Sequence, residues 1–565
     1  MNEFSMKMNR KSNAAVLAWL VVAATLLSHH ASPAAEDSFI ALVPAPVHLK
    51  VGTGAFELSG DTTIIARRGA EAEARKLGAA LRVPTGLPLP VTRRRPPAGA
   101  IILELDRALK PRLGSEGYQL AVEADGVLIR AAAEAGLFYG GMTLRQLLPP
   151  EGFGASQTAR PPQGWKVPAV EIEDYPRFAW RGLLLDPARH FMPPEFVKKL
   201  VDVMALHKLN SLQLHLTDDQ GWRLEIKKYP RLTRIGSVRS ESPAHGDRKR
   251  GDGAPYGPFF YTQAQMRDLV AYAQARHVTL VPEIEIPGHL LAALTAHPEF
   301  SCTGGPFEVR TRWGIEKDIL CVGNDAAIAF AKNILSEVCA LFPSRFIHIG
   351  GDEAPRDRWK TCSKCQARIE AEGLQSEAQL QTWLNHRLEK FLASKGRRLI
   401  GWDEILEGGL TPGAAVMSWR GTAGGLAAAE AGHDVVMSPT SHCYFDYAQA
   451  RDAGEPECIG GFLPLSKVYE FEPVPPALPE EKREHILGAQ GNLWSEYLWT
   501  PADVEYFAFP RATALAEVLW TPANGRDFSG FQQRLARHAA RLDQLKVNYR
   551  RLDSPMPAPK SPASP

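Results

Sequence analysis

At 565 residues the chain is longer than one ordinary domain and could hold a small domain joined to a large α/β barrel. Hydrophobic residues make up 45% of it, and its 12 tryptophans and 13 tyrosines indicate a globular protein with a large core. Lysine plus arginine (65) nearly balances aspartate plus glutamate (63), so the overall charge gives no case for a nucleic-acid partner or for an anionic membrane surface.

Residues 1–35 have the pattern of a secretory signal peptide. Basic residues at positions 7, 10 and 11 precede an apolar run from 14 to 27, and small residues follow up to Ala34 and Ala35. The apolar run is shorter than the ~20 residues that a membrane-spanning helix needs, so cleavage is expected rather than a retained anchor. We therefore expect an exported protein, periplasmic or secreted, without membrane attachment after cleavage.

The seven cysteines fit an oxidising compartment. We expect disulfides in sequence order, with Cys339 left buried and free in a helical stretch, although spacing alone does not fix the connectivity. A zinc site at the C-x-x-C of residues 362–365 would need two more ligands, and none lies at the usual spacing. A disulfide or free thiols are therefore favoured there. The expected pairs are Cys302 with Cys321, Cys362 with Cys365, and Cys443 with Cys458.

Residues 36–175 have the mixed pattern of a small α+β domain. Strand-like runs occur at 62–66 and 100–105, and 71–81 has helical spacing. Alternating apolar residues on both sides of Asp125-Gly126 predict a hairpin, and an amphipathic helix is expected over 134–147. No catalytic constellation is visible in this domain. The stretch 149–168, rich in proline and glycine, is interpreted as the linker to the next domain.

From Arg181 onward the chain repeats a pattern of apolar run, polar tip and helix. Eight such runs, most of them separated by helical patterns, predict a (β/α)8 barrel over residues 176–525. We expect a helix within 526–550 to pack on the barrel, and 551–565 to be a disordered tail. The expected strands are Gly182–Leu185, Ser211–Leu216, Thr279–Ile286, Phe346–Ile349, Arg398–Ile400, Ala414–Met417, Asp434–Met437 and His485–Gly488. The expected helices include Pro194–His207, Gln263–Arg276, Asp325–Phe342, Ser376–Ser394 and Thr422–Ala431.

Acids and aromatic residues follow every predicted strand. In a (β/α)8 barrel these strand ends meet on one face, where active sites lie. Aromatic faces combined with acids and arginine suit pyranose rings and their hydroxyls, so the pattern predicts a carbohydrate site. The residues are Asp186 and Arg189; His215, Asp218 and Asp219; Glu283, Glu285 and His289; Asp352 and Glu353; Trp402, Asp403 and Glu404; Trp419 and Arg420; Tyr444 and Asp446; and Trp494 and Glu496.

The segment Arg345–Glu353 is central to this face. A short apolar run ends in Gly350-Gly351 and then presents two adjacent carboxylates, Asp352 and Glu353. Neighbouring side chains on extended backbone point in opposite directions, so the two acids can converge only through a turn at the glycines. The alternative is a solvated loop in which Asp352 caps the next helix.

The motifs of this half resemble those of the family 20 glycoside hydrolases, the β-N-acetylhexosaminidases. They occur in the order of that family, and the preceding α+β segment resembles the small domain that usually comes before its barrel. The matching motifs are HLTDDQGW (215–222), PEIEIPGH (282–289), HIGGDE (348–353), GWDE (401–404), SWRG (418–421) and QGNLWSE (490–496).

The resemblance implies exo-hydrolysis of terminal β-linked N-acetylglucosamine or N-acetylgalactosamine with retention, in which the substrate's own 2-acetamido oxygen is the nucleophile. It also implies that Glu353 is the general acid and base, that Asp352 holds the acetamido N–H, and that Tyr444 holds the acetamido oxygen. Such an acid needs a raised pKa, from burial or neighbouring negative charge.

The resemblance gives the remaining residues binding and supporting roles. Trp402, Trp419 and Trp494 match an aromatic box for the acetamido methyl. Arg189 matches a clamp on the 3- and 4-hydroxyls, and Asp446 with Glu496 matches the acceptors for the 4- and 6-hydroxyls. The residues expected to tune the acid are His289, Asp218 or Asp219, and Glu285, which stands where the family often has aspartate.

Three alternatives remain open, and the oligomeric state stays undetermined. The first is a relative that releases a disaccharide such as lacto-N-biose. The second is a non-catalytic glycan-binding protein on the same barrel, which the complete acid pair disfavours. The third is a metal-dependent hydrolase with ligands among His215, Asp218, Asp219, His289, His348 and Asp352, whose spacing matches no standard two-histidine motif. We expect no cofactor and no catalytic metal.

Overall fold

The computed structural model describes residues 39–67, 69–94, 99–452 and 454–552. The predicted signal peptide lies outside this range, as does the predicted tail apart from its first two residues. The described residues from Ala41 onward form one compact unit. Over the described ranges, no helix combines the length and the apolar character needed to cross a membrane.

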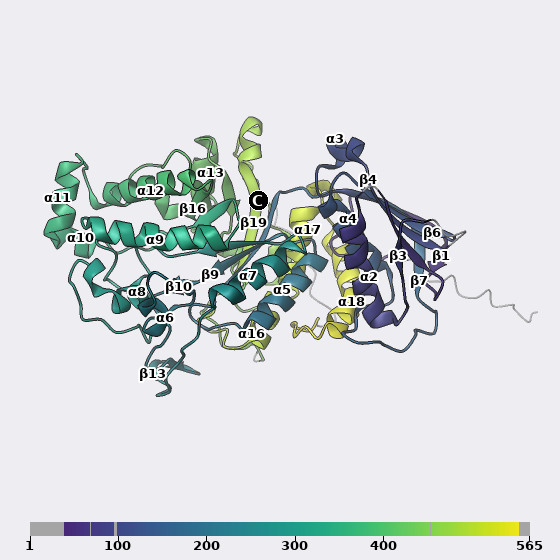
Figure 1. Cartoon of the computed structure of the whole chain (residues 1–565), viewed down its shortest axis with the longest axis horizontal. Coiled ribbons are helices and arrows are strands. Elements are labelled where there is room, and N and C mark those ends of the chain that lie inside the picture. Colours follow the sequence, from purple (N-terminus) through teal and green to yellow (C-terminus); the bar gives the residue numbers. More distant parts are fainter. Residues whose placement is uncertain (1–38, 68, 95–98, 453, 553–565) are drawn as a thin grey trace, which may run out of the picture. The chain divides into compact units, whose positions relative to one another are not determined.

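The N-terminal part is a seven-stranded sheet with the order β1-β7-β5-β6-β4-β2-β3, and helices α2 and α4 pack on it (Figure 1). The predicted hairpin is present: β5 pairs with β6 from Tyr118↔Ala131 to Glu123↔Gly126. Its buried side chains alternate with more exposed ones, so a single face is held against the helices. The bounds are β1 His48–Glu57, β2 Thr63–Arg67, α2 Glu71–Thr85, β3 Val91–Thr92, β4 Ala100–Leu105, β5 Tyr118–Glu123, β6 Gly126–Ala131, α4 Glu134–Leu147 and β7 Lys166–Asp174.

The predicted linker at 149–168 is wrong. β7 begins at Lys166 and pairs antiparallel with both β1 and β5, so the stretch connects two elements of the same sheet domain. Prolines and glycines do not distinguish a linker from a loop inside a domain, because both kinds of segment have the same composition. The passage to the barrel is instead the short segment between Asp174 and Trp180.

The remainder closes into the predicted barrel of eight parallel strands, in the order β14-β15-β16-β17-β18-β19-β8-β9. Each predicted apolar run forms one strand, and the last of them in the chain, β19, extends further toward the C-terminus than predicted. The strands are β8 Trp180–Leu185, β9 Ser211–His215, β14 Thr279–Glu283, β15 Phe346–His348, β16 Arg398–Trp402, β17 Ala415–Ser418, β18 Val435–Met437 and β19 Ile486–Leu493.

Helices cover the outside of the barrel, and three of them begin at a side-chain cap (Figure 1). Thr262 and Gln265 form a capping box at α7, and Asn324 and Ser376 accept backbone N–H bonds at α9 and α12. The main helices are α5 Pro194–Leu206, α7 Gln263–Gln274, α9 Asp325–Leu341, α12 Glu377–Ser394, α13 Ala423–Glu430 and α17 Arg511–Trp520.

Shorter elements occupy the connections. They are η1 Arg107–Leu109, α3 Lys110–Leu113, η2 Pro150–Phe153, β10 Thr217–Asp218, β11 Gly221–Trp222, α6 Arg231–Arg234, β12 Pro243–Ala244, β13 Asp247–Gly251, α8 Leu291–Ala296, η3 Pro298–Phe300, α10 Asp357–Thr361, α11 Ser363–Ala371, η4 Asp403–Leu406, α14 Thr440–Cys443, α15 Leu465–Tyr469, η5 Glu480–His485, α16 Pro501–Ala508 and η6 Ala523–Gly525.

The last helix, α18 (Phe528–Gln544), packs against both parts. His538 contacts His207 at the end of α5, with 2.8 Å between their Nε2 atoms. Arg534 pairs with Glu517 of α17 at 2.6 Å, whereas Arg541 donates to the carbonyl oxygens of Ala41 and Gln146. The predicted packing on the barrel is therefore accompanied by contacts with the N-terminal domain.

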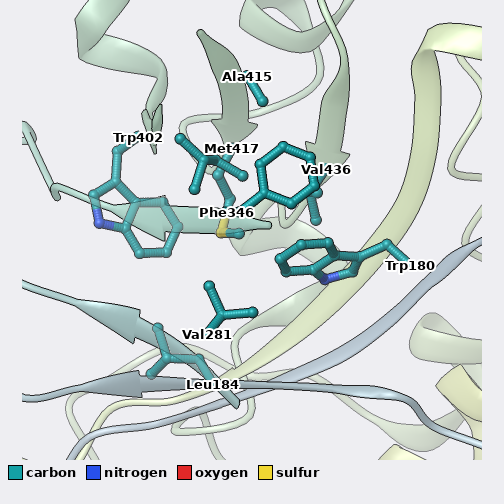
Figure 2. Close-up of a cluster of buried hydrophobic side chains, with 9 residues drawn as sticks. Trp180, Leu184, Val281, Phe346, Trp402, Ala415, Met417 and Val436 are labelled. Carbon is teal, nitrogen blue, oxygen red and sulfur yellow. The ribbon is translucent and has the colours of Figure 1, made fainter. Parts of the chain in front are cut away.

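A cluster of buried side chains fills the barrel interior (Figure 2). Phe346 and Met417 lie between Trp180 and Trp402, and the rings of Trp180 and Phe346 meet edge to face with centroids 5.8 Å apart. Burying one large aromatic side chain contributes roughly 2–3 kcal/mol. The cluster also fixes the indole of Trp402, which faces the catalytic end of the barrel.

Candidate active site

The carboxyl ends of the strands surround a cavity of about 320 Å³. All nine residues named from the sequence as catalytic or substrate-binding line it, together with His289. Four lining residues were missed: Thr440, Tyr447, Ile459 and Gly460. Thr440 begins the short helix α14 after β18, and the other three lie in the irregular segment beyond it, where no strand or helix period marks which side chains face inward. Only the nearness of Tyr447 to the named Tyr444 and Asp446 could have pointed to one of them.

The acid pair is delivered by the turn that the glycines predicted. β15 ends at His348, and Gly350 and Gly351 then adopt φ values of 63° and 92°. A β-carbon at Gly350 would lie 1.8 Å from Oε2 of Glu285, so this position needs glycine for its space as well as for its backbone conformation. Glu353 itself has a φ of 46°, a strained value for a residue with a side chain.

His289 lies between two pairs of carboxylates. Its Nδ1 is 3.3 Å from Oδ1 of Asp218 and 3.3 Å from Oδ2 of Asp219. Its Nε2 is 3.5 Å from Oε2 of Glu353 and 3.8 Å from Oδ2 of Asp352. Asp218 and Asp219 therefore both face Nδ1 of His289, so the two aspartates share the supporting position.

Electrostatics at His289 overturn one expectation. Burial alone would lower the pKa of His289, but Asp218 and the other carboxylates raise it well above its ordinary value. The hydrogen bond from His289 then lowers the pKa of Glu353, against the raised value expected for a general acid. Burial raises the pKa of Asp352 instead. The opposite shifts favour a charged imidazolium at His289 beside an ionised carboxylate at Glu353.

Glu285 is placed differently from the expectation. Its carboxyl lies under Gly350 and 3.7 Å from Nδ1 of His215, and within the described part of the chain neither of its oxygens has a hydrogen-bond partner. Burial, with Asp352 nearby, raises the pKa of Glu285 well above its ordinary value. The neutral acid supports the turn beneath the acid pair and does not hydrogen-bond His289.

Aromatic side chains form one wall of the cavity. Trp402 donates from Nε1 to Glu283 at 2.8 Å, and its ring centroid is 5.7 Å from that of Trp494. Trp419 stacks on Tyr444 at 6.2 Å and donates to Oε2 of Glu404 at 2.9 Å. Carboxylate bonds on two of the indoles fix the rotation of the rings, so the wall is formed before any ligand binds.

Arg189, Asp446 and Glu496 line another part of the cavity. Arg189 is held by Asp186 at 3.1 Å and by Asp218 at 2.7 Å. Burial, reinforced by Glu496, raises the pKa of Asp446 well above its ordinary value. Burial likewise raises the pKa of Glu496, although Arg189 opposes the shift. The two carboxyls can therefore both donate and accept hydrogen bonds.

The geometry argues against the metal-dependent alternative. Nδ1 of His215 lies 2.7 Å from Glu283, and its Nε2 lies 2.8 Å from Asp218. Burial would lower the pKa of His215, but Glu283 and Asp218 raise it to about 10. A protonated histidine with both nitrogens engaged by carboxylates offers no lone pair to a metal ion.

The predicted disulfides are absent: all seven cysteines, each of which lies in a described segment, are free. Cys339 is buried and free as expected. Cys302, Cys321, Cys362 and Cys365 gather in one place instead of forming two separate pairs. Sequence spacing could not reveal this, because the first two residues come from a long loop that returns to the second two.

A parallel barrel with a strained acid pair, a fixed aromatic wall and buried carboxyls at one end has the features of a glycoside hydrolase. The comparisons agree with this class. Residues 178–523 match the model of the glycosyl hydrolase family 20 catalytic domain, and residues 40–175 match domain 2 of the same family.

Relatives that are named as hexosaminidases extend the match over nearly the whole chain. A β-hexosaminidase of Porphyromonas gingivalis is 45% identical over 93% of this chain and 66% of its own length. A β-N-acetylhexosaminidase of Cellulomonas fimi is 32% identical over 93% of this chain and 98% of its own. The structure of a family 20 β-N-acetylhexosaminidase from Streptomyces coelicolor superposes with a TM-score of 0.78 and 32% identity, covering 91% of this chain and 98% of that one. The chain belongs to glycosyl hydrolase family 20.

Proposed function

We propose that this chain is an exo-acting β-N-acetylhexosaminidase that releases terminal N-acetylglucosamine or N-acetylgalactosamine with retention of configuration by substrate-assisted catalysis. The coarser assignment, a β-hexosaminidase, rests on family membership and on the named relatives. A Vibrio harveyi exo β-N-acetylglucosaminidase, solved in complex with N-acetylglucosamine, has a TM-score of 0.80 to this chain at 31% identity, over 91% of this chain and 78% of that one.

The observation that carries the proposal is a set of unpaired acceptors in the cavity. Oδ1 of Asp352, Oδ1 of Asp446 and Oε2 of Glu496 are buried, and within the described segments none of them has a hydrogen-bond partner. Leaving a buried polar oxygen unpaired costs ~1–3 kcal/mol, so each favours a ligand that supplies an O–H or N–H donor. An N-acetylated sugar supplies an amide N–H and several hydroxyls, and its methyl and ring faces suit the indoles.

In this proposal Asp352 and Glu353 have different roles: Asp352 holds the acetamido group, and Glu353 transfers protons. Asp352 accepts the acetamido N–H through Oδ1, which orients the acetamido oxygen toward the anomeric carbon and stabilises the positive charge that develops on the amide. Tyr444 donates its hydroxyl to the same acetamido oxygen. Attack on the anomeric carbon breaks the glycosidic bond, and Glu353 gives a proton to the departing oxygen. Glu353 then takes a proton from the water that opens the cyclic intermediate, so the configuration is retained.

His289 supports the general acid as a proton reservoir. The imidazolium next to Glu353 holds the shared proton at 3.5 Å, and Asp218 and Asp219 keep the ring charged. When a sugar enters and excludes water, the proton moves to Glu353, which donates it to the leaving group. The carboxylate that remains faces the same ring and can be protonated again.

The decisive assay compares an aryl N-acetyl-β-glucosaminide with the matching aryl β-glucoside. We expect the N-acetyl substrate to be strongly preferred, because only it carries the internal nucleophile. Equal rates on the two substrates would refute the acetamido mechanism. Glu353→Gln should lose most activity on poor leaving groups, and Asp352→Ala should lose the preference for the N-acetyl sugar; undiminished turnover in either variant would contradict its role.

Exo action is supported by Asp446 and Glu496, whose buried carboxyls suit the hydroxyls of a terminal sugar. The product released from a tetrasaccharide tests this point. We expect a monosaccharide, and release of a disaccharide would favour the lacto-N-biose type of enzyme. Export rests on the pattern of residues 1–35 alone, and secretion of a reporter fused to that segment tests it.

A further inference from the structure

We propose that Cys302, Cys321, Cys362 and Cys365 bind one structural zinc ion through their four thiolates. All four sulfur atoms lie within 4.8 Å of one another. The proposal is independent of the hexosaminidase assignment, and its site contains no residue of the sugar pocket.

The distances between the sulfurs fit a tetrahedral metal site. Three of the separations, Cys302 to Cys365, Cys321 to Cys362 and Cys321 to Cys365, are each 3.8 Å. A zinc–sulfur bond of ~2.3 Å places any two sulfurs of a regular tetrahedron ~3.8 Å apart. A disulfide would require ~2.05 Å between two of them, and a pair of disulfides would not make one sulfur equidistant from two others.

The backbone around the cluster is shaped to bring the ligands together. The backbone N–H of Gly323 donates to Sγ of Cys365 at 3.4 Å, a bond that stabilises a metal-bound thiolate. A β-carbon at Gly323 would lie 2.1 Å from the carbonyl carbon of Lys364, so only glycine permits the turn after Cys321 to approach the C-x-x-C segment. Lys364 lies between two of the ligands in the sequence and adds a positive charge to this segment.

The ligand set makes the ion structural. Zinc replaces four thiol protons, so binding releases four protons and leaves a closed complex with a net charge of two minus, without any redox step. Four protein ligands leave no position for water or substrate. The ion would fasten the loop between η3 and α9 to the C-x-x-C segment at α10 and α11, which follows the acid pair in the chain.

Other contacts also join the loop between η3 and α9 to the C-x-x-C segment, and one contact joins this loop to the active site. Trp359 donates from Nε1 to the carbonyl of Leu320 at 2.9 Å, and Arg358 pairs with Asp318 at 2.9 Å. Further along the loop, the backbone N–H of Glu316 donates to Oδ2 of Asp219 at 3.1 Å. Asp219 is one of the two acids that keep His289 charged, so loss of zinc should loosen a support of the general acid.

The test is the metal and thiol content of the full chain, purified without chelator or reductant. We expect about one zinc per chain by elemental analysis, and its release as a mercurial titrates the four cluster thiols by forming mercury–sulfur bonds with them. The three other cysteines serve as the internal reference. A metal-free chain whose mass is lower by the four hydrogens lost in forming two disulfides would overturn the proposal, and so would a metal-free chain with four freely reactive thiols at the cluster.

Variants make the assignment specific to these residues. Cys302→Ser and Cys365→Ser should retain less than ~0.1 zinc per chain and unfold at lower temperature, whereas Cys339→Ser, a buried cysteine outside the cluster, should keep the full content. Gly323→Ala should weaken zinc retention, and Gly60→Ala, with nothing within 4 Å of its added β-carbon, should not. Full zinc content in both cysteine ligand variants would overturn the proposal.

A spectroscopic measurement on the unaltered chain covers the case in which the variants fail to fold. Exchange of zinc for Co²⁺ should produce the thiolate-to-cobalt charge-transfer bands and the intense visible bands of a tetrahedral four-thiolate site. Weak bands typical of octahedral oxygen ligation would contradict the proposal. Chelation of the metal should lower Tm. Any decrease in the rate of sugar hydrolysis should follow from the loosening of the loop that supports Asp219, because the ion takes no part in the reaction.

Discussion

Replacement of His289 by asparagine should move the alkaline limit of activity to lower pH. The reason is that His289 and Glu353 together hold the proton that the leaving group needs. In the unaltered protein the pair loses its last proton only as pH rises through the raised pKa of His289, which lies well above 6.5. In His289→Asn the only proton available is that of Glu353 itself, whose pKa starts from an ordinary ~4.3 and is raised by burial. The basic limb of kcat/KM should therefore shift down by about two units or more.

The magnitude follows from the slope of that limb. Above its governing pKa, activity falls about tenfold per pH unit, so across a two-unit window the variant should lose ~100-fold relative to its own maximum while the unaltered protein stays on its plateau. The loss should be large for alkyl or sugar leaving groups and small for a nitrophenyl group, which departs without a proton.

The assay is kcat/KM against pH with both kinds of leaving group, and the matched control is His297→Asn. His297 is also buried, but its Nδ1 contacts Glu299 at 3.1 Å, and it is not among the residues that line the cavity. An unchanged basic limb in His289→Asn, or an equal loss on both leaving groups, would refute the reservoir. A shift in the control as well would point to a general effect of removing a buried histidine.

Three further substitutions test other parts of the site. Trp402→Ala should cost about 3–5 kcal/mol of stability, measured by denaturant unfolding, because the indole is 1% exposed within the barrel core. Burial, with Asp352 next, raises the pKa of Glu404 from an ordinary 4.5 to about 8, so the folded state holds a proton that the unfolded state has lost, and stability falls as pH rises between these values. Glu404→Gln should remove that slope, at most ~1.4 kcal/mol per pH unit, while its amide oxygen still accepts from Trp419; an unchanged slope would contradict the shift. Gly350→Ala should abolish turnover, whereas Gly373→Ala, with a similar φ of 66° but open space around it, should cost only ~1–2 kcal/mol of stability; equal activity in the two variants would refute the packing argument.

The barrel and the position of its site could be predicted because each rests on a local pattern. Parallel strands that are buried on both faces appear as apolar runs, and the residue after each run is the residue at the catalytic face. Two glycines before two acids predict a turn, and Gly350 and Gly351 make that turn. Ile459 and Gly460 were not predicted to line the cavity because the irregular segment that contains them has no strand or helix period.

The sense of the pKa shift at Glu353 could not be predicted from residue types. A carboxylate next to another acid, in a buried position, is expected to titrate at raised pH, and Asp352 does so. Whether Glu353 follows depends on the 3.5 Å contact with His289 and on the two aspartates that charge the ring, and all three come from other strands. A charge network built from residues distant in sequence decides the direction.

The cysteine cluster also could not be predicted from the sequence, because its members are distant along the chain. Its position suggests a connection with the carboxylates around His289. The C-x-x-C at 362–365 was set aside as a metal site because no third and fourth ligand lay nearby in sequence, yet Cys302 and Cys321 meet it in space. Both the cysteine cluster and the contact of Glu316 with Asp219 fasten the loop that follows the third barrel strand of the chain, β14. The fold of the barrel positions the acids, but the charge on His289 depends on Asp219 staying in place. This loop is held near both of its ends by Cys302 and Cys321 and between them by that carboxylate, so it connects the stability of the surface segment to the protonation of the general acid.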